Sequence, residues 1–280
     1  MSTSRAAPEL AAPLDLDRLL AEGDLGACCA AVYAHPAVRW LLGGELHPGG
    51  AALTRRAFEL IGLEPEDRLL DVGSGDGATV LLAAGEHGCR AVGVEYGAGA
   101  VEEARRRAGE LGFEDRVEFV AAEAAALPFA DGTFDVVVSE CSLCTFADKA
   151  RAVGEMRRVL APGGRLALSD VVAEVECLPG ELRSALGAVA CVGDALAPGS
   201  HRELLEGAGF EVFAEEDRSG DAIEMTDRIA DRLRGAKVLG LDDLIPLDGG
   251  APAALALVAE AREAITDGRI GYTLVSAART

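Results

Sequence analysis

The sequence predicts an α/β protein with a doubly wound, mostly parallel sheet of seven strands, an N-terminal helical cap and a C-terminal helical insertion. Two observations carry this prediction. From Arg68 onward, short apolar runs alternate with segments of helical composition, the pattern of βαβ units. The first such run ends in a cluster of glycines, the usual strand-to-helix turn of open α/β sheets. Right-handed crossovers between parallel strands then place helices on both faces of the sheet.

The N-terminal part reads as helices and a loop. Residues 14–20 have amphipathic helical composition, and a second helix carries Cys28, Cys29, Tyr33 and the run 38–42. Residues 43–50 contain four glycines and Pro48, which predicts a loop. We therefore expect residues 1–50 to form a helical cap on a main domain of residues 51–280, with a helical insertion at about 219–269.

The remaining elements follow in order along the chain. The main block is predicted to contain strands at 68–72, 91–95, 117–121, 134–139 and 165–170, with helices at 51–61, 78–87, 98–111 and 148–160. Pro162-Gly163-Gly164 is expected to form the turn before the fifth strand. The tail adds a helix at 200–207, a strand at 210–215, a helix at 222–239, a loop at 246–252, a helix at 253–266 and a last strand at 271–278.

Charge and composition exclude several classes of function. The 280 residues include 26 Lys and Arg but 47 Asp and Glu, a net charge of −21, which argues against binding to nucleic acid or to an anionic membrane surface. No run of ~20 apolar residues could span a bilayer, and the start MSTSRAAPEL lacks a signal-peptide pattern. The seven cysteines, an odd number, fit a reducing compartment, so we expect a cytoplasmic protein.

The glycine cluster is the first candidate site. The segment Asp71-Val72-Gly73-Ser74-Gly75-Asp76-Gly77 ends a strand and opens a helix, where glycines let the backbone approach a ligand closely. Glu95 closes the next strand, where a carboxylate can bind two ribose hydroxyls. A nicotinamide-binding turn or a bare tight turn is the alternative, although the third glycine comes one residue early for the dinucleotide fingerprint. Asp71 could instead brace the loop.

Over residues 50–175 the sequence resembles the class I S-adenosylmethionine-dependent methyltransferases, a Rossmann-like fold. The glycine loop, Glu95, Glu123, Phe134-Asp135-Val136 and Pro162-Gly163-Gly164 carry the resemblance. It implies S-adenosylmethionine as the cofactor. The residues it implies for the cofactor site are Asp71, Gly73, Ser74, Gly75, Gly77, Glu95, Tyr96, Ala122, Glu123 and Glu140.

Cysteines follow the strands where the acceptor of the methyl group should lie. Cys141 and Cys144 come directly after the fourth strand, and Cys191 lies between the fifth strand and the next helix. With Cys28 or Cys29 from the cap, these positions resemble the arsenite methyltransferases, which hold trivalent arsenic through thiolates. The resemblance implies catalytic roles for Cys141, Cys191, Cys28, Cys29 and Cys144, with Cys28, Cys141 and Cys191 as ligands of As(III).

The resemblance also implies a thiol reductant such as glutathione or thioredoxin. Thiolates are the ligands that soft centres select, so selenium, tellurium, antimony or an organic thiol would also fit. The sequence departs from the family in having Glu140 before the fourth-strand cysteine, no cysteine in Leu41-Leu42-Gly43-Gly44 and no cysteine-rich tail.

Three other functions remain open. The first is a natural-product O-, N- or C-methyltransferase with structural cysteines and with His47 or Glu140 as general base. The second is a metalloid-binding or sensing protein without activity. The third is a redox protein built on Cys141-x-x-Cys144, which lacks the expected βαβ context.

Overall fold

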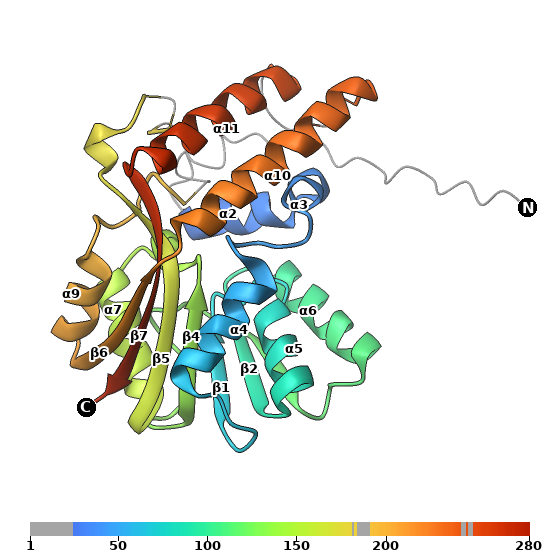
Figure 1. Cartoon of the computed structure of the whole chain (residues 1–280). Coiled ribbons are helices and arrows are strands. Elements are labelled where there is room, and N and C mark those ends of the chain that lie inside the picture. The colour runs from blue at the N-terminus through green and yellow to red at the C-terminus, as the bar shows by residue number, and fades with distance from the viewer. Residues whose placement is uncertain (1–24, 181, 184–190, 242–244, 246–248) are drawn as a thin grey trace, which may run out of the picture.

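The computed structural model describes residues 25–180, 182–183, 191–241, 245 and 249–280 (Figure 1). The helix expected at 14–20 lies outside these ranges. Within them, no helix is both long enough and apolar enough to cross a bilayer.

The sheet has the predicted doubly wound form. Its seven strands lie in the order β3-β2-β1-β4-β5-β7-β6. All neighbouring pairs are parallel except those of β7, which runs antiparallel to β5 and to β6. The strands are β1 (Arg68–Val72), β2 (Arg90–Glu95), β3 (Val117–Ala121), β4 (Phe134–Glu140), β5 (Leu160–Ala173), β6 (Phe210–Asp217) and β7 (Ile270–Arg279).

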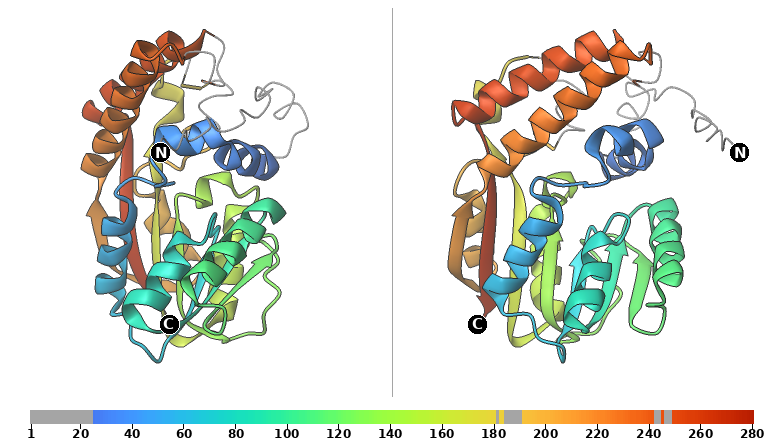
Figure 2. Two further views of the ribbon diagram at one scale, coloured as in Figure 1. Left: turned by 90° about the vertical axis from the view of Figure 1, so that its right-hand side faces the viewer. Right: turned by 45° about the vertical axis from the view of Figure 1, so that its right-hand side comes forward.

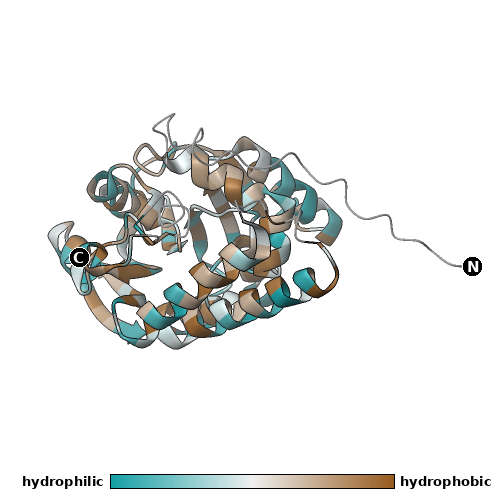
Figure 3. Ribbon diagram, turned by 90° about the horizontal axis from the view of Figure 1, so that it is seen from above, coloured by the Kyte–Doolittle hydropathy of each residue, from teal (hydrophilic) through white to brown (hydrophobic). Residues whose placement is uncertain are grey.

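Helices cover both faces of the sheet, as Figure 2 shows. On one face, α4 (Gly50–Ile61), α5 (Ala78–Leu82) and α6 (Ala98–Leu111) bury a core that includes Leu53, Val80 and Val101. On the other, α7 (Lys149–Val159) and α9 (Ser200–Gly207) pack through Met156 and Leu205. Seen from above, the apolar residues gather on the strands between the helices (Figure 3). Burial of these apolar side chains is the main force that holds the layers together.

The cap differs from the single helix expected around Cys28. The chain forms α2 (Leu25–Ala34) and then α3 (Pro36–Leu42), with a break at His35. Pro36 disfavours helical backbone at the preceding residue, so a new helix starts with proline in its first turn. The His35 ring Nδ1 accepts a hydrogen bond from the backbone N–H of Ala37 at 3.2 Å and caps this new helix.

Four other boundaries differ from the prediction. The helix expected at 78–87 is α5 followed by a π-helical turn, Ala83–His87. The Pro162-Gly163-Gly164 turn lies inside β5, as an irregularity where the pairing with β4 jumps from Leu160 to Arg165. A short 3-10 helix, η2 (Leu143–Thr145), follows β4. α11 (Gly250–Thr266) begins inside the expected loop, because Pro252 is tolerated in the first turn of a helix.

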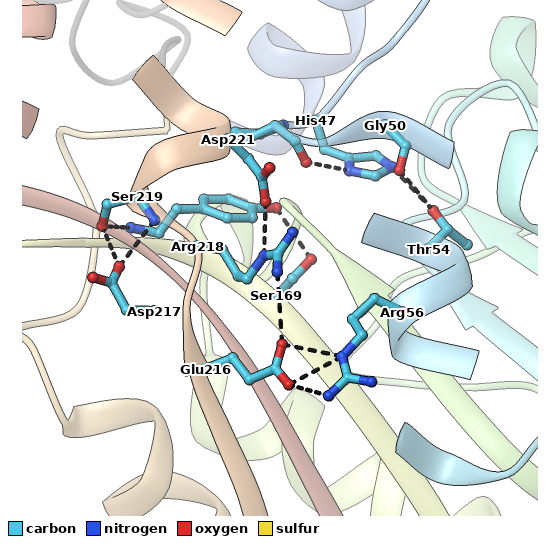
Figure 4. Close-up of polar contacts among 12 residues, drawn as sticks. His47, Gly50, Thr54, Arg56, Ser169, Glu216, Asp217, Arg218, Ser219 and Asp221 are labelled. Carbon is cyan, nitrogen blue, oxygen red and sulfur yellow. Dashed lines mark hydrogen bonds and ion pairs between the residues drawn. The ribbon is translucent and has the colours of Figure 1, made fainter. Parts of the chain in front are cut away.

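The insertion between β6 and β7 consists of two helices. α10 (Ser219–Val238) and α11 pack on each other and on β7, and α10 also contacts α3 of the cap. Ion pairs tie α10 and β6 to α4: Glu216 binds Arg56 at 2.5 Å, and Arg218 binds Asp221 at 2.7 Å (Figure 4). These contacts fix the insertion beside the carboxyl ends of the central strands.

Candidate active site

A cavity of about 870 Å³ opens at the carboxyl ends of the parallel strands. Its walls come from the ends of β1, β2 and β4, from α2 and α3 of the cap, and from the first turns of α6 and α7. Ligands of open α/β sheets bind at this edge, where the loops that follow the strands converge.

The glycine loop lines the cavity with backbone in the left-handed region, which favours glycine. Gly73, Gly75 and Gly77 have φ of 82°, 53° and 79°. A Cβ on Gly73 would lie 2.4 Å from Cβ of Ser142, so a side chain there would collide with the segment after β4. The loop between β1 and α5 is therefore held close against the segment after β4 and, through hydrogen bonds to the Val94 carbonyl, against β2.

Glu95 links this loop to the end of β2. Its carboxylate oxygens accept hydrogen bonds from the backbone N–H groups of Gly75 at 3.0 Å and Gly97 at 2.9 Å. Of the residues predicted for the cofactor, those in the cavity wall are Gly73, Gly75, Glu95, Tyr96, Ala122, Glu123 and Glu140. Those behind the wall are Asp71, Ser74 and Gly77. The hydroxyl of Ser74 is buried with no hydrogen-bond partner.

Carboxylates dominate the electrostatics of the cavity. Asp71 is buried, and desolvation together with the nearby charges of Glu140 and Glu95 holds its pKa well above the usual range. Glu140 accepts hydrogen bonds from Thr79 at 2.7 Å and Thr54 at 3.1 Å. A positively charged ligand would relieve this concentration of negative charge. An adenosyl sulfonium compound has the charge, the hydroxyls and the length that the cavity and Glu95 suit.

Three predicted thiols meet at one corner of the cavity. Cys141 is in the wall, Cys144 and Cys191 are buried and not part of it, and the Cys191 thiol donates to the Cys141 carbonyl at 3.9 Å. Cys141 and Cys191 have φ of 51° and 64°, and no other non-glycine residue in the described ranges has positive φ. Left-handed backbone at two cysteines is strain of the kind that functional sites retain.

Cys191 contacts both Tyr33 and Cys141. The Tyr33 hydroxyl is 3.5 Å from the Cys191 sulfur, and the Cys191 thiol donates to the Cys141 carbonyl at 3.9 Å. The neighbouring Cys141 and Cys144, and then Tyr33, hold the pKa of Cys191 well below its usual value, whereas the neighbouring Cys141 and Cys191, and then burial, raise the pKa of Cys144. Burial and the charge of Cys191 raise the pKa of nearby Asp170 to about 7.

The two cap cysteines are placed differently. Cys29 is in the cavity wall near Cys191, and burial followed by that neighbour raises its pKa to about 12. Cys28 is buried away from the cavity wall. The structure therefore does not bring Cys28 together with Cys141 and Cys191. In the described ranges, no group of three His, Cys, Asp or Glu side chains is placed so that it could hold a metal ion.

The other predicted base, His47, lies next to Glu140 and Thr54. Its Nε2 is 3.5 Å from the Thr54 hydroxyl (Figure 4) and 3.8 Å from a Glu140 carboxylate oxygen, but the residue is not part of the cavity wall. Of the two bases expected for an oxygen or nitrogen acceptor, only Glu140 reaches the cavity.

Comparison with known families decides the class of protein. A family model described as a methyltransferase domain matches residues 63–209, more than half of the sequence, including β1 to β5 and the glycine loop. The chain belongs to the methyltransferase domain family. Demethylmenaquinone methyltransferases are among its curated relatives, and complexes with S-adenosylmethionine or S-adenosylhomocysteine are among the solved structures that share its fold.

Curated relatives match parts of the methyltransferase. The demethylmenaquinone methyltransferase of Thermus thermophilus is 39% identical over 50% of this chain and 64% of its own length. Methyltransferase GfsG of Streptomyces halstedii is 36% identical over 45% and 46%. The arsenite methyltransferase of Halobacterium salinarum is 34% identical over 61% and 44%. The chain thus spans less than two thirds of the length of these relatives.

Solved structures extend the likeness over nearly the whole methyltransferase. The [4+2]-cyclase SpnF has a TM-score of 0.71 at 27% identity, covering 91% of this chain and 95% of its own. The phosphoethanolamine methyltransferase 2 of Haemonchus contortus, in complex with S-adenosylhomocysteine, has a TM-score of 0.76 at 18% identity, covering 95% and 60%. At that identity the second likeness concerns the fold alone.

Sequence reasoning missed several residues of the site. Arg39 of α3 pairs with Asp76 of the glycine loop at 2.5 Å, so the cap is tied to the cofactor loop. Asp170, at the end of β5, accepts a hydrogen bond from the Cys144 backbone N–H. The Ser169-Asp170 pair at a strand end was the available signal for Asp170. Nothing in the sequence pointed to Arg39, because its partner is remote along the chain.

Proposed function

We propose that this methyltransferase transfers a methyl group to a trivalent metalloid held by cysteine thiolates, with arsenite as the first substrate to test. The observation that carries the proposal is the approach of Cys191 to Cys141 at the wall of the cavity, where the Cys191 thiol donates to the Cys141 carbonyl at 3.9 Å. Thiolates bind soft centres in preference to hard ones, and three of them satisfy the three bonds of As(III).

The cofactor part of the reaction uses the floor and far wall of the cavity. S-adenosylmethionine supplies a methyl group on a positively charged sulfur, which departs as a neutral thioether. Glu95 would bind the ribose hydroxyls, and the glycine loop would hold the methionine end, with Asp71 and Glu140 close to its positive charge. Buried carboxylates that lack a counter-ion favour a cationic ligand, which supports this orientation.

The acceptor part of the reaction depends on position more than on acid–base chemistry. An arsenic atom bound to three sulfurs keeps a lone pair, so no side chain has to remove a proton from the nucleophile. Cys141 in the cavity wall and Cys191 behind it would fix the arsenic beside the methyl group, and Tyr33 would cover it from the cap. Alignment and exclusion of water then supply most of the rate enhancement.

A second candidate acceptor is an organic hydroxyl group. GfsG and the 27-O-demethylrifamycin SV methyltransferase of Amycolatopsis mediterranei, 39% identical over 42% of this chain, favour it. Glu140 would then be the general base, because it is in the cavity wall. This alternative leaves the contact between Cys191 and Cys141, and the left-handed backbone of both residues, without a function, so we rank it second.

The test is a methyl-transfer assay with S-adenosylmethionine, arsenite and glutathione, in which methylated arsenic is resolved by mass spectrometry. We expect wild type to form methylated arsenic, Cys141→Ser and Cys191→Ser to lose it, and Cys177→Ser, an exposed cysteine outside the site, to keep it. Replacing glutathione with thioredoxin identifies the reductant. A wild-type protein that binds the cofactor but methylates no arsenic would overturn the proposal and redirect the search to organic acceptors.

A further inference from the structure

A second cavity, of about 430 Å³, lies at the edge of the sheet opposite to the candidate active site. Its walls come from the amino ends of β1, β2 and β3 and from the turn before β3, far from the cap (Figure 1). A cavity of this volume is large enough to hold a small metabolite.

Three exposed arginines stand side by side in the wall of this second cavity. Arg68 begins β1 and Arg90 begins β2, and the two are partners in the parallel register of these strands. Arg116 comes directly before β3, and its carbonyl accepts a hydrogen bond at 3.2 Å from the N–H of Ala91, the residue after Arg90. Because neighbouring strands are about 4.8 Å apart, the three backbones span only roughly 10 Å. The sheet therefore sets three positive charges, the arginine row, along one edge.

The arginine row lacks carboxylate partners. The Arg68 guanidinium carbon is 5.6 Å from the centroid of the Phe134 ring, and Arg116 Nη1 donates to the Gly88 carbonyl at 3.4 Å. None of the three guanidinium groups forms an ion pair with any residue that the structure describes. Like charges at paired positions of neighbouring strands destabilise a sheet. An anion bound between the guanidinium groups would remove this repulsion.

Carboxylates in the same wall restrict the kind of anion that fits. Glu114, Asp115 and Glu118 line the cavity without pairing with the arginine row. They would repel an extended polyanion such as a nucleic acid, as would the net charge of −21. The site therefore suits one compact anionic group, and Ala91 and Phe134 offer apolar surface beside it.

We propose that the arginine row binds a phosphate group, either as inorganic phosphate or as the phosphate of a small phosphorylated metabolite. A guanidinium group donates two parallel hydrogen bonds to phosphate. A phosphate monoester carries a charge of about −1.5 to −2 and three acceptor oxygens, so it can bind more than one arginine, whereas a carboxylate has one charge and two oxygens. No residue of the candidate active site takes part, so this inference is independent of the proposed metalloid substrate.

The test is a calorimetric titration of the full-length protein, saturated with S-adenosylmethionine so that the cofactor does not leave its cavity open to the probe. The probes are inorganic phosphate, phenyl phosphate and benzoate. We expect phenyl phosphate to bind at low ionic strength with a Kd below about 1 mM, and benzoate to bind at least about tenfold more weakly. Inorganic phosphate that binds as tightly as phenyl phosphate identifies the free ion as the ligand, and weaker binding identifies a phosphate ester.

Variants of the arginine row show where the phosphate binds. Arg90→Gln and Arg68→Gln should each bind phenyl phosphate at least about tenfold more weakly, and Arg90→Lys should lie between Arg90→Gln and wild type, because lysine keeps the charge but loses the planar fork. Arg234→Gln is the matched control, since Arg234 is an exposed arginine on α10 that pairs with Asp231, and it should bind like wild type. All variants should keep S-adenosylmethionine binding, which shows that they are folded.

The stability of the ligand-free protein gives a second readout. At low ionic strength Arg90→Gln should unfold at a higher urea concentration than wild type, because one of three repelling charges is gone, and added phosphate should raise the midpoint of wild type more than that of the variant. The inference is wrong if wild type shows no saturable binding of either phosphate, if benzoate binds as tightly as phenyl phosphate, or if both glutamine variants of the arginine row bind phenyl phosphate like wild type.

Discussion

Cys141 and Cys191 lie 50 residues apart in the sequence, yet the Cys191 thiol donates a hydrogen bond to the Cys141 carbonyl at 3.9 Å and both residues have left-handed backbone. Left-handed backbone costs an L-residue roughly 1–2 kcal/mol. Two separate segments therefore carry the same unfavourable conformation in order to turn their sulfur atoms toward one point. A packing role alone gives no reason for such a conformation at two cysteines.

The left-handed backbone at Cys191 predicts that a glycine variant at this position is more stable than an alanine variant. Cys191→Gly should unfold at higher urea concentration than Cys191→Ala, by about 0.5–1 kcal/mol in free energy of unfolding, because glycine adopts positive φ without a steric cost. Both variants should lose arsenite binding. The matched pair at Cys144, which lies in the 3-10 helix η2 without positive φ, should show the reverse order. Equal stability of Gly and Ala at position 191 would contradict the strain.

The order of the strands could be predicted because it follows from local patterns and general rules. Apolar runs that end in turn residues gave β1 to β4 to within a residue or two, and crossover handedness gave the layers. The boundaries that failed depend on tertiary contacts. The extension of β5 to Leu160 requires pairing with Phe134, and the break at His35 follows from Pro36, which the hydrophobic pattern does not register.

The candidate site was predictable where residues are neighbours in sequence, and less so where they meet only in space. The glycine loop and Glu95 lie at the carboxyl ends of neighbouring strands, so topology alone brings them together. The resemblance implies a third thiol from Cys28 or Cys29, and helical periodicity does not tell which of two adjacent cysteines faces the cavity. In the structure Cys29 is in the cavity wall and Cys28 is not.

Replacing Gly73 with alanine should weaken the binding of the cofactor to the glycine loop. Gly73→Ala places a Cβ 2.4 Å from Ser142 Cβ at φ of 82°, so we expect the free energy of unfolding to fall by about 1–3 kcal/mol and S-adenosylmethionine affinity to fall at least about tenfold. Gly154→Ala, in the open middle of α7, should instead be neutral or stabilising by up to about 1 kcal/mol. Calorimetric binding together with urea unfolding measures both effects.

Asp71 should lower the stability of the ligand-free protein and strengthen its binding of the cofactor. Its folded-state pKa lies well above the unfolded value, so ionisation opposes folding and stability is lost as the pH rises between these two pKa values. Asp71→Asn should therefore make the ligand-free protein more stable, with a larger gain at pH 8 than at pH 5.5, and should weaken S-adenosylmethionine binding. Urea unfolding at the two pH values tests this, and a gain that is larger at pH 5.5 would contradict it.

His201 should make the fold sensitive to mild acid. Burial lowers its pKa to about 4, and its Nδ1 is 3.1 Å from the Thr273 hydroxyl. A depressed folded-state pKa means that stability is fully present above the unfolded value of about 6.5 and is lost as the pH falls toward 4, by at most about 3 kcal/mol. His201→Gln should unfold with a flatter dependence on pH between 7.5 and 5. If the free energy of unfolding depended on pH in the same way in wild type and in His201→Gln, His201 would not titrate in this range.

The ion pair between Arg39 and Asp76 should control how long the cofactor stays bound. Asp76 is buried and also pairs with Arg107 at 2.7 Å, so Arg39→Gln leaves its charge compensated and should change the free energy of unfolding by less than about 1 kcal/mol. The cap loses its link to the glycine loop, so S-adenosylmethionine should dissociate about 3–10-fold faster, as stopped-flow displacement would show. Arg55→Gln removes an exposed pair with Glu86 away from the cavity and should leave dissociation unchanged. An unchanged rate in Arg39→Gln would mean that the cap does not retain the cofactor through this contact.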